Sequence, residues 1–175
     1  MKIYTKFGDD GFTSLQSGER VKKDDLSIEV LGELDELNCH IGLLITYMFN
    51  ARDIDFLYQL QNLLFLLSAN LQNEHFSLDE YCMQIEHEID TIQNILPDIH
   101  CFLLPGGSQS SAHAHICRCI CRKVERKVVS LLNIRPIHPK IIQVLNRISD
   151  YFYVLARKIN FENGISEKKW QNTCK

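Results

Sequence analysis

The sequence predicts an all-α fold, a single domain built as a five-helix up-and-down bundle. Five separate stretches repeat apolar residues at steps of three and four, the period of a helix with one buried face. No stretch shows the alternation of apolar and polar residues that is typical of strands. The connections are short, which favours antiparallel neighbours, and 175 residues with 45% hydrophobic content suit one core.

The first two helices are predicted from long periodic stretches that follow a glycine-bearing N-terminal segment. The apolar positions of the first are Ile28, Leu31, Leu34, Leu37, Ile41, Leu44, Ile45 and Met48. Those of the second are Ile54, Leu57, Leu60, Leu64, Leu67 and Leu71. Steps of three and four place each set on one side of its helix, so each helix offers one face to the core.

The third helix is predicted to begin near Ser77, because Ser77 and Glu80 have the spacing of a capping box. Its apolar positions are Ile85, Ile89, Ile92 and Ile95. Pro97 ends it.

The last two helices follow the turn Pro105-Gly106-Gly107, with the fourth predicted from about Ser108 to Asn133 and the fifth from near Pro139. The buried face of the fifth is Ile141, Leu145, Ile148, Phe152, Leu155 and Ile159, and its polar face is Asn146, Asp150, Tyr153 and Arg157. We expect an N-terminal segment 1–25, a helical bundle 26–161 and a frayed polar tail 162–175 that only Trp170 anchors.

The fourth helix carries a cationic stripe, because Arg118, Arg122 and Arg126 recur every fourth residue. Glu125 joins this stripe, whereas Ile116, Ile120, Val124 and Val128 follow a separate face. Three guanidinium groups on one face repel one another. The pattern therefore predicts that one face builds the core and the other binds an anion.

Composition excludes several broad functions. The formal net charge is −3, from 19 basic and 22 acidic residues, which argues against general nucleic-acid binding. No apolar run reaches the length of a membrane span, and the N-terminus has no apolar signal region, so we expect a cytoplasmic protein. Seven cysteines, an odd number, are expected to be reduced thiols.

Metal sites made by cysteine or histidine are disfavoured. Cys117 and Cys121 share a helical face, but no nearby Cys or His completes a tetrahedral set. His113 and His115 lie two residues apart and therefore on different helical faces, which favours packed or surface histidines.

The N-terminal segment contains a loop that could wrap a phosphate chain. Gly8 and Gly11 free its backbone, and its hydroxyl and ammonium donors are Thr5, Lys6, Thr13 and Ser14. Its spacing is not that of a P-loop, and composition alone favours a turn between short extended pieces. Lys23 adds a nearby cation. Asp35 lies beside an apolar stripe, where it would be exposed or would need a partner such as an arginine.

Taken together, these motifs resemble the ATP:cob(I)alamin adenosyltransferases of the propanediol-utilisation type. The resemblance covers most of the chain and rests on ordered blocks rather than on one motif. The blocks are Ile3-Tyr4-Thr5-Lys6, Gly8-Asp9 with Gly11, Gly18-Glu19-Arg20, Lys23-Asp24-Asp25, Gly32 with Asp35-Glu36-Leu37-Asn38, Phe102 with Leu104-Pro105-Gly106-Gly107, the arginine helix and Leu145-Asn146-Arg147-Ile148-Ser149-Asp150-Tyr151.

The resemblance implies the ferritin-like five-helix fold of this family, assembled as a homotrimer, with ATP between neighbouring subunits and the corrinoid above it. It implies that the N-terminal loop wraps the triphosphate with Thr5, Lys6, Phe7, Gly8, Thr13, Ser14 and Lys23. The neighbouring subunit would contribute Arg122, Lys123, Val124, Glu125, Arg126 and Asn146. Asp35 and Arg118 would form an intersubunit ion pair, and Phe102 would meet the corrin ring.

The implied reaction is attack of the cobalt(I) of cob(I)alamin on the 5′ carbon of ATP, with triphosphate as the leaving group and Mg²⁺ beside it. The protein then has to align the substrates and stabilise charge on the leaving group, without a nucleophile of its own. Phe102 would keep the lower ligand of cobalt off. Candidate partners are a cob(II)alamin reductase and an adenosylcobalamin-dependent enzyme, whereas the metal ligands stay open.

Three positions depart from the family pattern: Asp10, where Lys or Arg is usual; Lys123, where Arg is common; and Tyr153, often Phe. Asp10 would repel a triphosphate unless it holds the metal or points outward. One alternative function is a non-catalytic carrier that delivers adenosylcobalamin to a dependent enzyme. Another is a helical scaffold whose arginine stripe docks an acidic partner.

Overall fold

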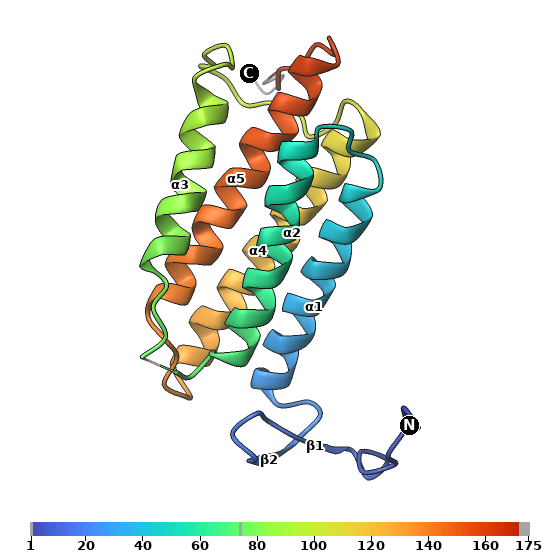
Figure 1. The fold of residues 1–175 in the computed structure, drawn as a ribbon, viewed down its shortest axis with the longest axis vertical. Coiled ribbons are helices and arrows are strands. Elements are labelled where there is room, and N and C mark those ends of the chain that lie inside the picture. The colour runs from blue at the N-terminus through green and yellow to red at the C-terminus, as the bar shows by residue number, and fades with distance from the viewer. Residues whose placement is uncertain (1, 74, 172–175) are drawn as a thin grey trace.

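The structure, a computed structural model, describes residues 2–73 and 75–171. In this part of the chain it contains five helices preceded by a small hairpin, which confirms the predicted all-α class (Figure 1). The helices are α1 Leu26–Ile45, α2 Ala51–Ala69, α3 Asp79–Gln93, α4 Gln109–Leu132 and α5 Lys140–Glu162. The strands are β1 Phe12–Ser14 and β2 Arg20–Lys22.

Side-chain caps explain where three of the helices begin. The carboxylate of Asp25 accepts the backbone N–H of Ser27 at the start of α1, over 2.8 Å. Asn50 caps α2 in the same way, and the Ser108 hydroxyl accepts the N–H of Ser111 at the start of α4. Each cap satisfies a backbone donor that has no partner inside its helix.

The predicted capping box of α3 is wrong, although the helix begins within two residues of Ser77. Leu78 is its N-cap, no side chain caps it, and the helix begins at Asp79 and ends at Gln93, before Ile95. Leu78 is buried in the core, whereas Ser77 is exposed. Burial of an apolar side chain therefore fixes this helix start in place of the expected capping box.

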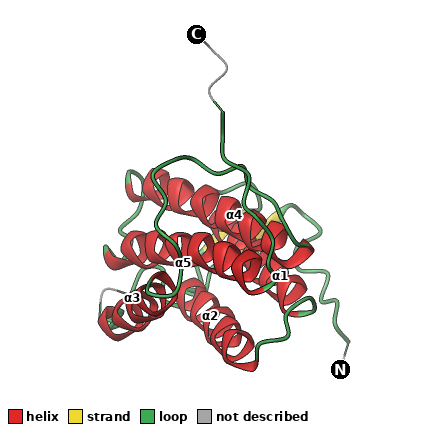
Figure 2. Cartoon of the chain, turned by 90° about the horizontal axis from the view of Figure 1, so that it is seen from above, coloured by secondary structure: helices red, strands yellow, loops and turns green. Residues whose placement is uncertain are grey.

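The helices pack as a bundle in which α4 and α5 are central neighbours (Figures 1 and 2). α1 packs on α4 and α2, and α3 packs on α5. α5 is the most enclosed helix, since all of residues 151–160 except Tyr153 are buried. Within the core, the rings of Phe56 and Tyr151 meet edge to face with their centroids 4.8 Å apart.

A buried ion pair joins α2 to α5. The ammonium of Lys158 lies 2.6 and 2.8 Å from the two carboxylate oxygens of Asp53, and both residues are buried. Charges taken out of water are costly unless they are paired, so this contact fixes which faces of the two helices meet.

The described N-terminal segment contains the turn between short extended pieces that composition favours, whereas the described part of the tail is more ordered than the sequence predicts. β1 pairs antiparallel with β2, although strands of three residues are too short to show alternation. The tail, predicted to be frayed, pairs with the loop before α4: Leu104 N–H donates to the Lys168 carbonyl, and Trp170 N–H to the Phe102 carbonyl. Trp170 thus is an anchor, as expected; residues 172–175 lie outside the described residues. None of the described helices combines the length and apolarity that a bilayer crossing requires.

Candidate functional site

The arginine stripe lies on the outer side of α4. Arg122 and Arg126 are exposed, while the core-facing residues Ile120, Val124 and Val128 are buried. The helical rise places Arg118 and Arg126 about 12 Å apart along the axis. Such a row of guanidinium groups is suited to an extended polyanion.

The three arginines have no acidic partner in the part of the chain that the structure describes. Among the residues that the structure describes, no ion pair includes Arg118, Arg122 or Arg126. The Nε of Arg118 is also buried without a hydrogen-bond partner in this part of the chain. An unpaired, partly buried cation calls for an anion that comes from outside the subunit.

Lys123 behaves differently from its arginine neighbours. Its ammonium lies 2.8 Å from the carboxylates of both Glu33 and Glu36 on α1. One turn later, Lys127 contacts Glu29 and Glu33 at 2.8 and 2.9 Å. The hydrogen bond to Glu33 raises the pKa of Lys123. These pairs tie α4 to α1 and leave the arginines as the charges that face outward.

One polar contact joins the stripe to α5. The side-chain amide of Asn146 donates to a carboxylate oxygen of Glu125 over 3.2 Å, and its carbonyl accepts from Arg147 at 2.9 Å. The structure therefore brings together two residues that the sequence placed at one site. Val124, a third, has its side chain in the core, where it supports the helix rather than faces a ligand.

The N-terminal segment extends away from the bundle beside the start of α1 (Figures 1 and 2). Thr5, Lys6 and Phe7 are exposed, with the Phe7 ring 86% accessible. Lys6 has a φ of 63°, a left-handed conformation that is unusual for a residue other than glycine. Thr13 and Ser14 lie in β1, opposite Val21 and Arg20. The segment thus presents donors without packing against its own bundle.

Lys23 folds back onto this loop. Its N–H donates to the Gly11 carbonyl at 2.9 Å, and a Cβ at Gly8 would lie only 3.0 Å from the Lys23 ammonium. The absence of a side chain at Gly8 leaves room for this approach. The structure therefore gathers Gly8 and Lys23 at the place where the sequence predicted a phosphate-wrapping loop.

Asp10 points into the hairpin. Its carboxylate pairs with Arg20 and accepts the N–H of Phe12 at 3.2 Å, and this N–H together with Arg20 holds the pKa of Asp10 below its usual value. The guanidinium of Arg20 also stacks over the Phe12 ring. The charge that departs from the family pattern is therefore neutralised locally.

Phe102 lies at the other end of the bundle, before α4. Its ring is 78% exposed and meets Trp170 of the tail edge to face, with centroids 6.2 Å apart. A pocket of about 570 Å³ opens beside it, with Tyr153 and Arg157 in its wall. Asp35 is exposed on α1 and is not paired with Arg118 in the described part of the subunit.

The sequence did not single out His115 as more than a packed histidine. Its side chain is 7% exposed, its ring centroid is 6.4 Å from that of Tyr153, and its Nδ1 has no partner among the described residues. Burial and the nearby charge of Arg118 lower its pKa to about 4. His113, in contrast, stacks on Tyr47 at 5.1 Å. No group of three His, Cys, Asp or Glu side chains within the described ranges could hold a metal ion.

Comparison with known proteins decides the family. The cobalamin adenosyltransferase family model matches residues 3–159. The chain belongs to the cobalamin adenosyltransferase family. A cobalamin adenosyltransferase from Cupriavidus metallidurans is 40% identical, over 97% of this chain and 94% of that relative. A corrinoid adenosyltransferase from Bacillus subtilis is 36% identical, over 99% and 94%.

Solved structures of the family have the same fold. A variant of a PduO-type ATP:corrinoid adenosyltransferase from Lactobacillus reuteri, complexed with cobalamin and ATP, superposes with a TM-score of 0.93 at 29% identity. The match covers 98% of this chain and all of that one. The fold predicted from the resemblance is confirmed, including the arrangement of the five helices.

Proposed function

We propose that this chain transfers the 5′-deoxyadenosyl group of ATP to cob(I)alamin, which gives adenosylcobalamin and triphosphate. The observation that carries the proposal is the arginine stripe of α4 without acidic partners in the described subunit, in a chain of this family. Structure neighbours bound to cobalamin and ATP support the same pair of substrates. The transferase is therefore favoured over a scaffold that docks an acidic protein.

Lys6 and Lys23 hold the triphosphate in this proposal, together with the backbone of Phe7 and Gly8. The hydroxyl donors of the same segment are Thr5, Thr13 and Ser14. Arg122 and Arg126 of a neighbouring subunit neutralise the charge that grows on the leaving triphosphate, and Asn146, oriented by Glu125, faces the nucleoside. Lys123 is already paired with two glutamates, so we assign it to holding α4 in place.

The reaction needs alignment more than acid or base catalysis. Cob(I)alamin supplies the nucleophile, the bond from cobalt to the 5′ carbon forms as the bond to the triphosphate oxygen breaks, and no proton has to move. The role of the protein is to hold the two substrates in line and to exclude water. In this proposal Phe102 contacts the corrin ring and keeps its lower ligand away from cobalt, which its exposure beside a pocket supports.

We propose that Mg²⁺ enters as part of the ATP substrate. The described residues offer no ready cluster of three acidic or histidine ligands, and Asp10 is engaged by Arg20. Mg²⁺ binds phosphate oxygens and keeps several waters, so it does not require a protein cage. The residues present fit a metal that the triphosphate itself carries.

We also propose that the active unit is a homotrimer with shared sites. Residues 2–11 extend away from their own bundle, the Nε of Arg118 is buried without a partner in the described subunit, and Asp35 is exposed (Figure 1). An ion pair between Asp35 of one subunit and Arg118 of the next would satisfy both charges.

An anaerobic assay with purified protein, ATP and chemically reduced cob(I)alamin tests the function. We expect each protein molecule to convert many molecules of cob(I)alamin to adenosylcobalamin. The change in absorbance between the two corrinoids measures this conversion. Arg122→Ala should lower kcat/KM by about 100-fold or more, the usual cost of losing one charge-stabilising group.

Phe102→Ala should slow turnover while ATP affinity stays near that of the wild type.

Two results would contradict this assignment. Binding of ATP and corrinoid without turnover would favour the carrier, and Arg122→Ala would then alter only cofactor release. A Phe102→Ala enzyme as fast as the wild type would remove Phe102 from the corrin site. Arg52→Ala, a change in an exposed pair with Glu88, serves as the surface control.

A further inference from the structure

Arg135, which lies outside the proposed substrate site, joins the segment after α4 to the hairpin and to the start of α1. Arg135 follows the end of α4, and its guanidinium lies 2.6 and 3.0 Å from the two carboxylate oxygens of Glu19. It also lies 3.4 Å from Asp25, the N-cap of α1. Its side chain is 20% exposed, so the contacts are partly shielded from water. Because this pairing is bidentate, it fixes the orientation of the Glu19 carboxylate relative to the Arg135 guanidinium as well as the distance between them.

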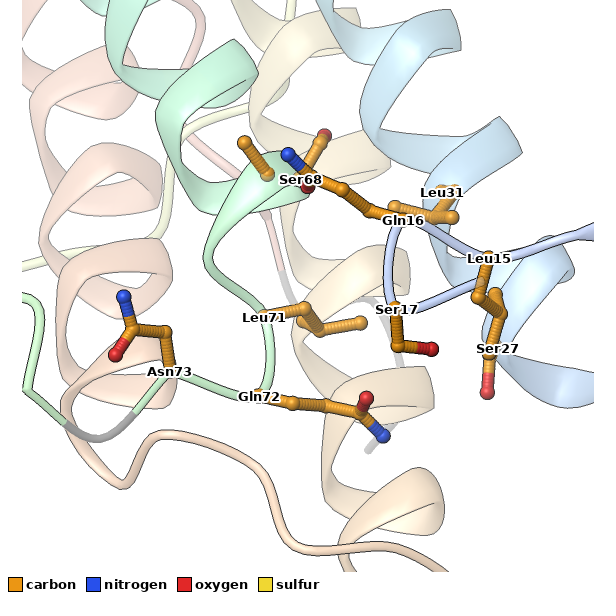
Figure 3. A pocket seen from close by; sticks show the side chains of 10 residues that line it. Leu15, Gln16, Ser17, Ser27, Leu31, Ser68, Leu71, Gln72 and Asn73 are labelled. Atoms are coloured by element: carbon orange, nitrogen blue, oxygen red, sulfur yellow. The ribbon is translucent and has the colours of Figure 1, made fainter. Parts of the chain in front are cut away.

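Few other contacts hold the hairpin to the bundle. Of the residues from Phe12 to Lys22, only Val21 is buried. The turn at Leu15–Ser17 does not close on the helices, because a pocket of about 290 Å³ separates it from the end of α2 (Figure 3). Since Val21 is the one buried side chain between residues 12 and 22, the orientation of the hairpin depends largely on the Glu19–Arg135 contact.

The hairpin in turn sets the positions of groups proposed to bind ATP. Thr13 and Ser14 belong to β1, and Lys23 follows β2 directly. The Lys23 N–H bond to the Gly11 carbonyl connects the hairpin to the projecting loop. A change in the angle of the hairpin would therefore move the hydroxyl and ammonium donors together.

We propose that Arg135 is a positioning residue for ATP: by holding Glu19 it orients the N-terminal segment before ATP arrives. This inference rests on the proposed adenosyltransferase function. A segment held in its binding orientation loses less conformational freedom on binding than one that swings freely. Arg135 itself does not touch the nucleotide, since Glu19 and Asp25 already neutralise it.

The test compares steady-state kinetics of Arg135→Ala, Glu19→Gln and Arg135→Lys with the wild type. If the segment is correctly oriented about a tenth of the time in Arg135→Ala, KM for ATP rises about tenfold. The kcat and KM for cob(I)alamin should stay within about twofold, because the bound state is unchanged. Arg135→Lys keeps the charge but loses the bidentate fork, so its KM for ATP should be intermediate.

Glu19→Gln keeps the test valid if Arg135→Ala folds poorly, since Glu19 is exposed and its loss leaves the cap of α1 in place. Hydrogen exchange without ATP should show faster exchange of the hairpin amides in Arg135→Ala and unchanged protection of α5. Arg52→Ala should match the wild type throughout.

Wild-type KM for ATP in both Arg135→Ala and Glu19→Gln would overturn the inference, and so would a fall in kcat with KM unchanged. A wild-type protein that transfers no adenosyl group would overturn the proposed function instead, so the two failures are distinguishable.

Discussion

His115 shows how a single residue in the arginine helix responds to its surroundings. It is buried beside Tyr153 and close to Arg118, so a second positive charge there would be both desolvated and repelled. The ring therefore stays neutral at physiological pH. A neutral imidazole next to Arg118 leaves that guanidinium as the charge available to an acidic partner.

The free energy of unfolding should fall as the pH falls and His115 becomes protonated. Its folded pKa, about 4, lies below the ordinary 6.5, so its contribution is complete above pH 6.5 and declines as pH falls toward 4. The loss is on the order of 3 kcal/mol. Urea unfolding at pH 7 and pH 4 measures it, with His115→Gln as control. An equal pH dependence in both proteins would contradict the assignment.

The sequence predicts which residues share a helix face, but it does not predict which side chains form ion pairs across the fold. The arginine stripe was predictable because i, i+4 spacing on a helix fixes which side chains share a face. The partners of Asp10 and Arg135 were not, since Arg20 and Glu19 reach them through a hairpin turn whose geometry the sequence does not display. Lys123 also resembled its arginine neighbours until the position of α1 was known.

At the scale of elements, Asn160 of α5 holds the turn that precedes α4. Its side-chain carbonyl accepts the N–H of Ser108 at 3.1 Å, and its amide donates to the Gly106 carbonyl at 2.9 Å. The Ser111 hydroxyl adds a bond to the Ala156 carbonyl at 2.9 Å. Because Phe102 lies just before this turn, the contacts of Asn160 also position the loop beside the pocket that Phe102 lines.

Gly107→Ala should be strongly destabilising. A Cβ there would clash with the Asn160 side-chain oxygen, and the φ of 117° is unfavourable for alanine. Strain and clash together should cost about 2–4 kcal/mol, seen as a lower urea midpoint at unchanged slope. Gly164→Ala is the matched control, since it has a φ of 65° with no atom within 4 Å and tests backbone strain alone. Equal losses in the two variants would rule out the clash.

Helices were predictable where burial repeats over many residues, and so were the ends of α4 at Ser108 and Asn133 and the start of α5 at Pro139. The five periodic stretches correspond to α1–α5, but α3 begins where Leu78 reaches the core rather than at a capping box. The paired tail was missed because one backbone bridge to Leu103 leaves no pattern in the sequence. The buried Lys158–Asp53 pair likewise joins residues 105 positions apart.

At the scale of the whole molecule, the lysines of α4 are paired with acidic residues of the same chain and the arginines of α4 are not, within the described residues. Glu33 and Glu36 neutralise Lys123 within the subunit, whereas no acidic group among the described residues pairs with the arginine stripe. The same division supports the proposed trimer, in which Asp35 and Arg118 of different subunits meet. The resemblance predicted this assembly, and it stays a prediction for measurement in solution.

Charge reversal tests the assembly. The wild type should sediment as three chains of 20.3 kDa, and Arg118→Glu should weaken the trimer because the introduced carboxylate would face the carboxylate of Asp35. Combining Arg118→Glu with Asp35→Arg should restore much of the association by re-forming the pair. A monomeric wild type, or single variants that remain fully trimeric, would contradict an intersubunit Asp35–Arg118 contact.

The folded-back tail gives this protein an optical probe of its own. Trp170 is the only tryptophan in the chain, and its indole lies against Phe102, which lines the pocket proposed to bind the corrin ring. Tryptophan emission reports on the few ångströms around the ring, and corrinoids absorb strongly in the near ultraviolet. Selective excitation of Trp170 therefore reports on the surroundings of Phe102 and on corrinoid binding without a dye or an engineered fluorophore.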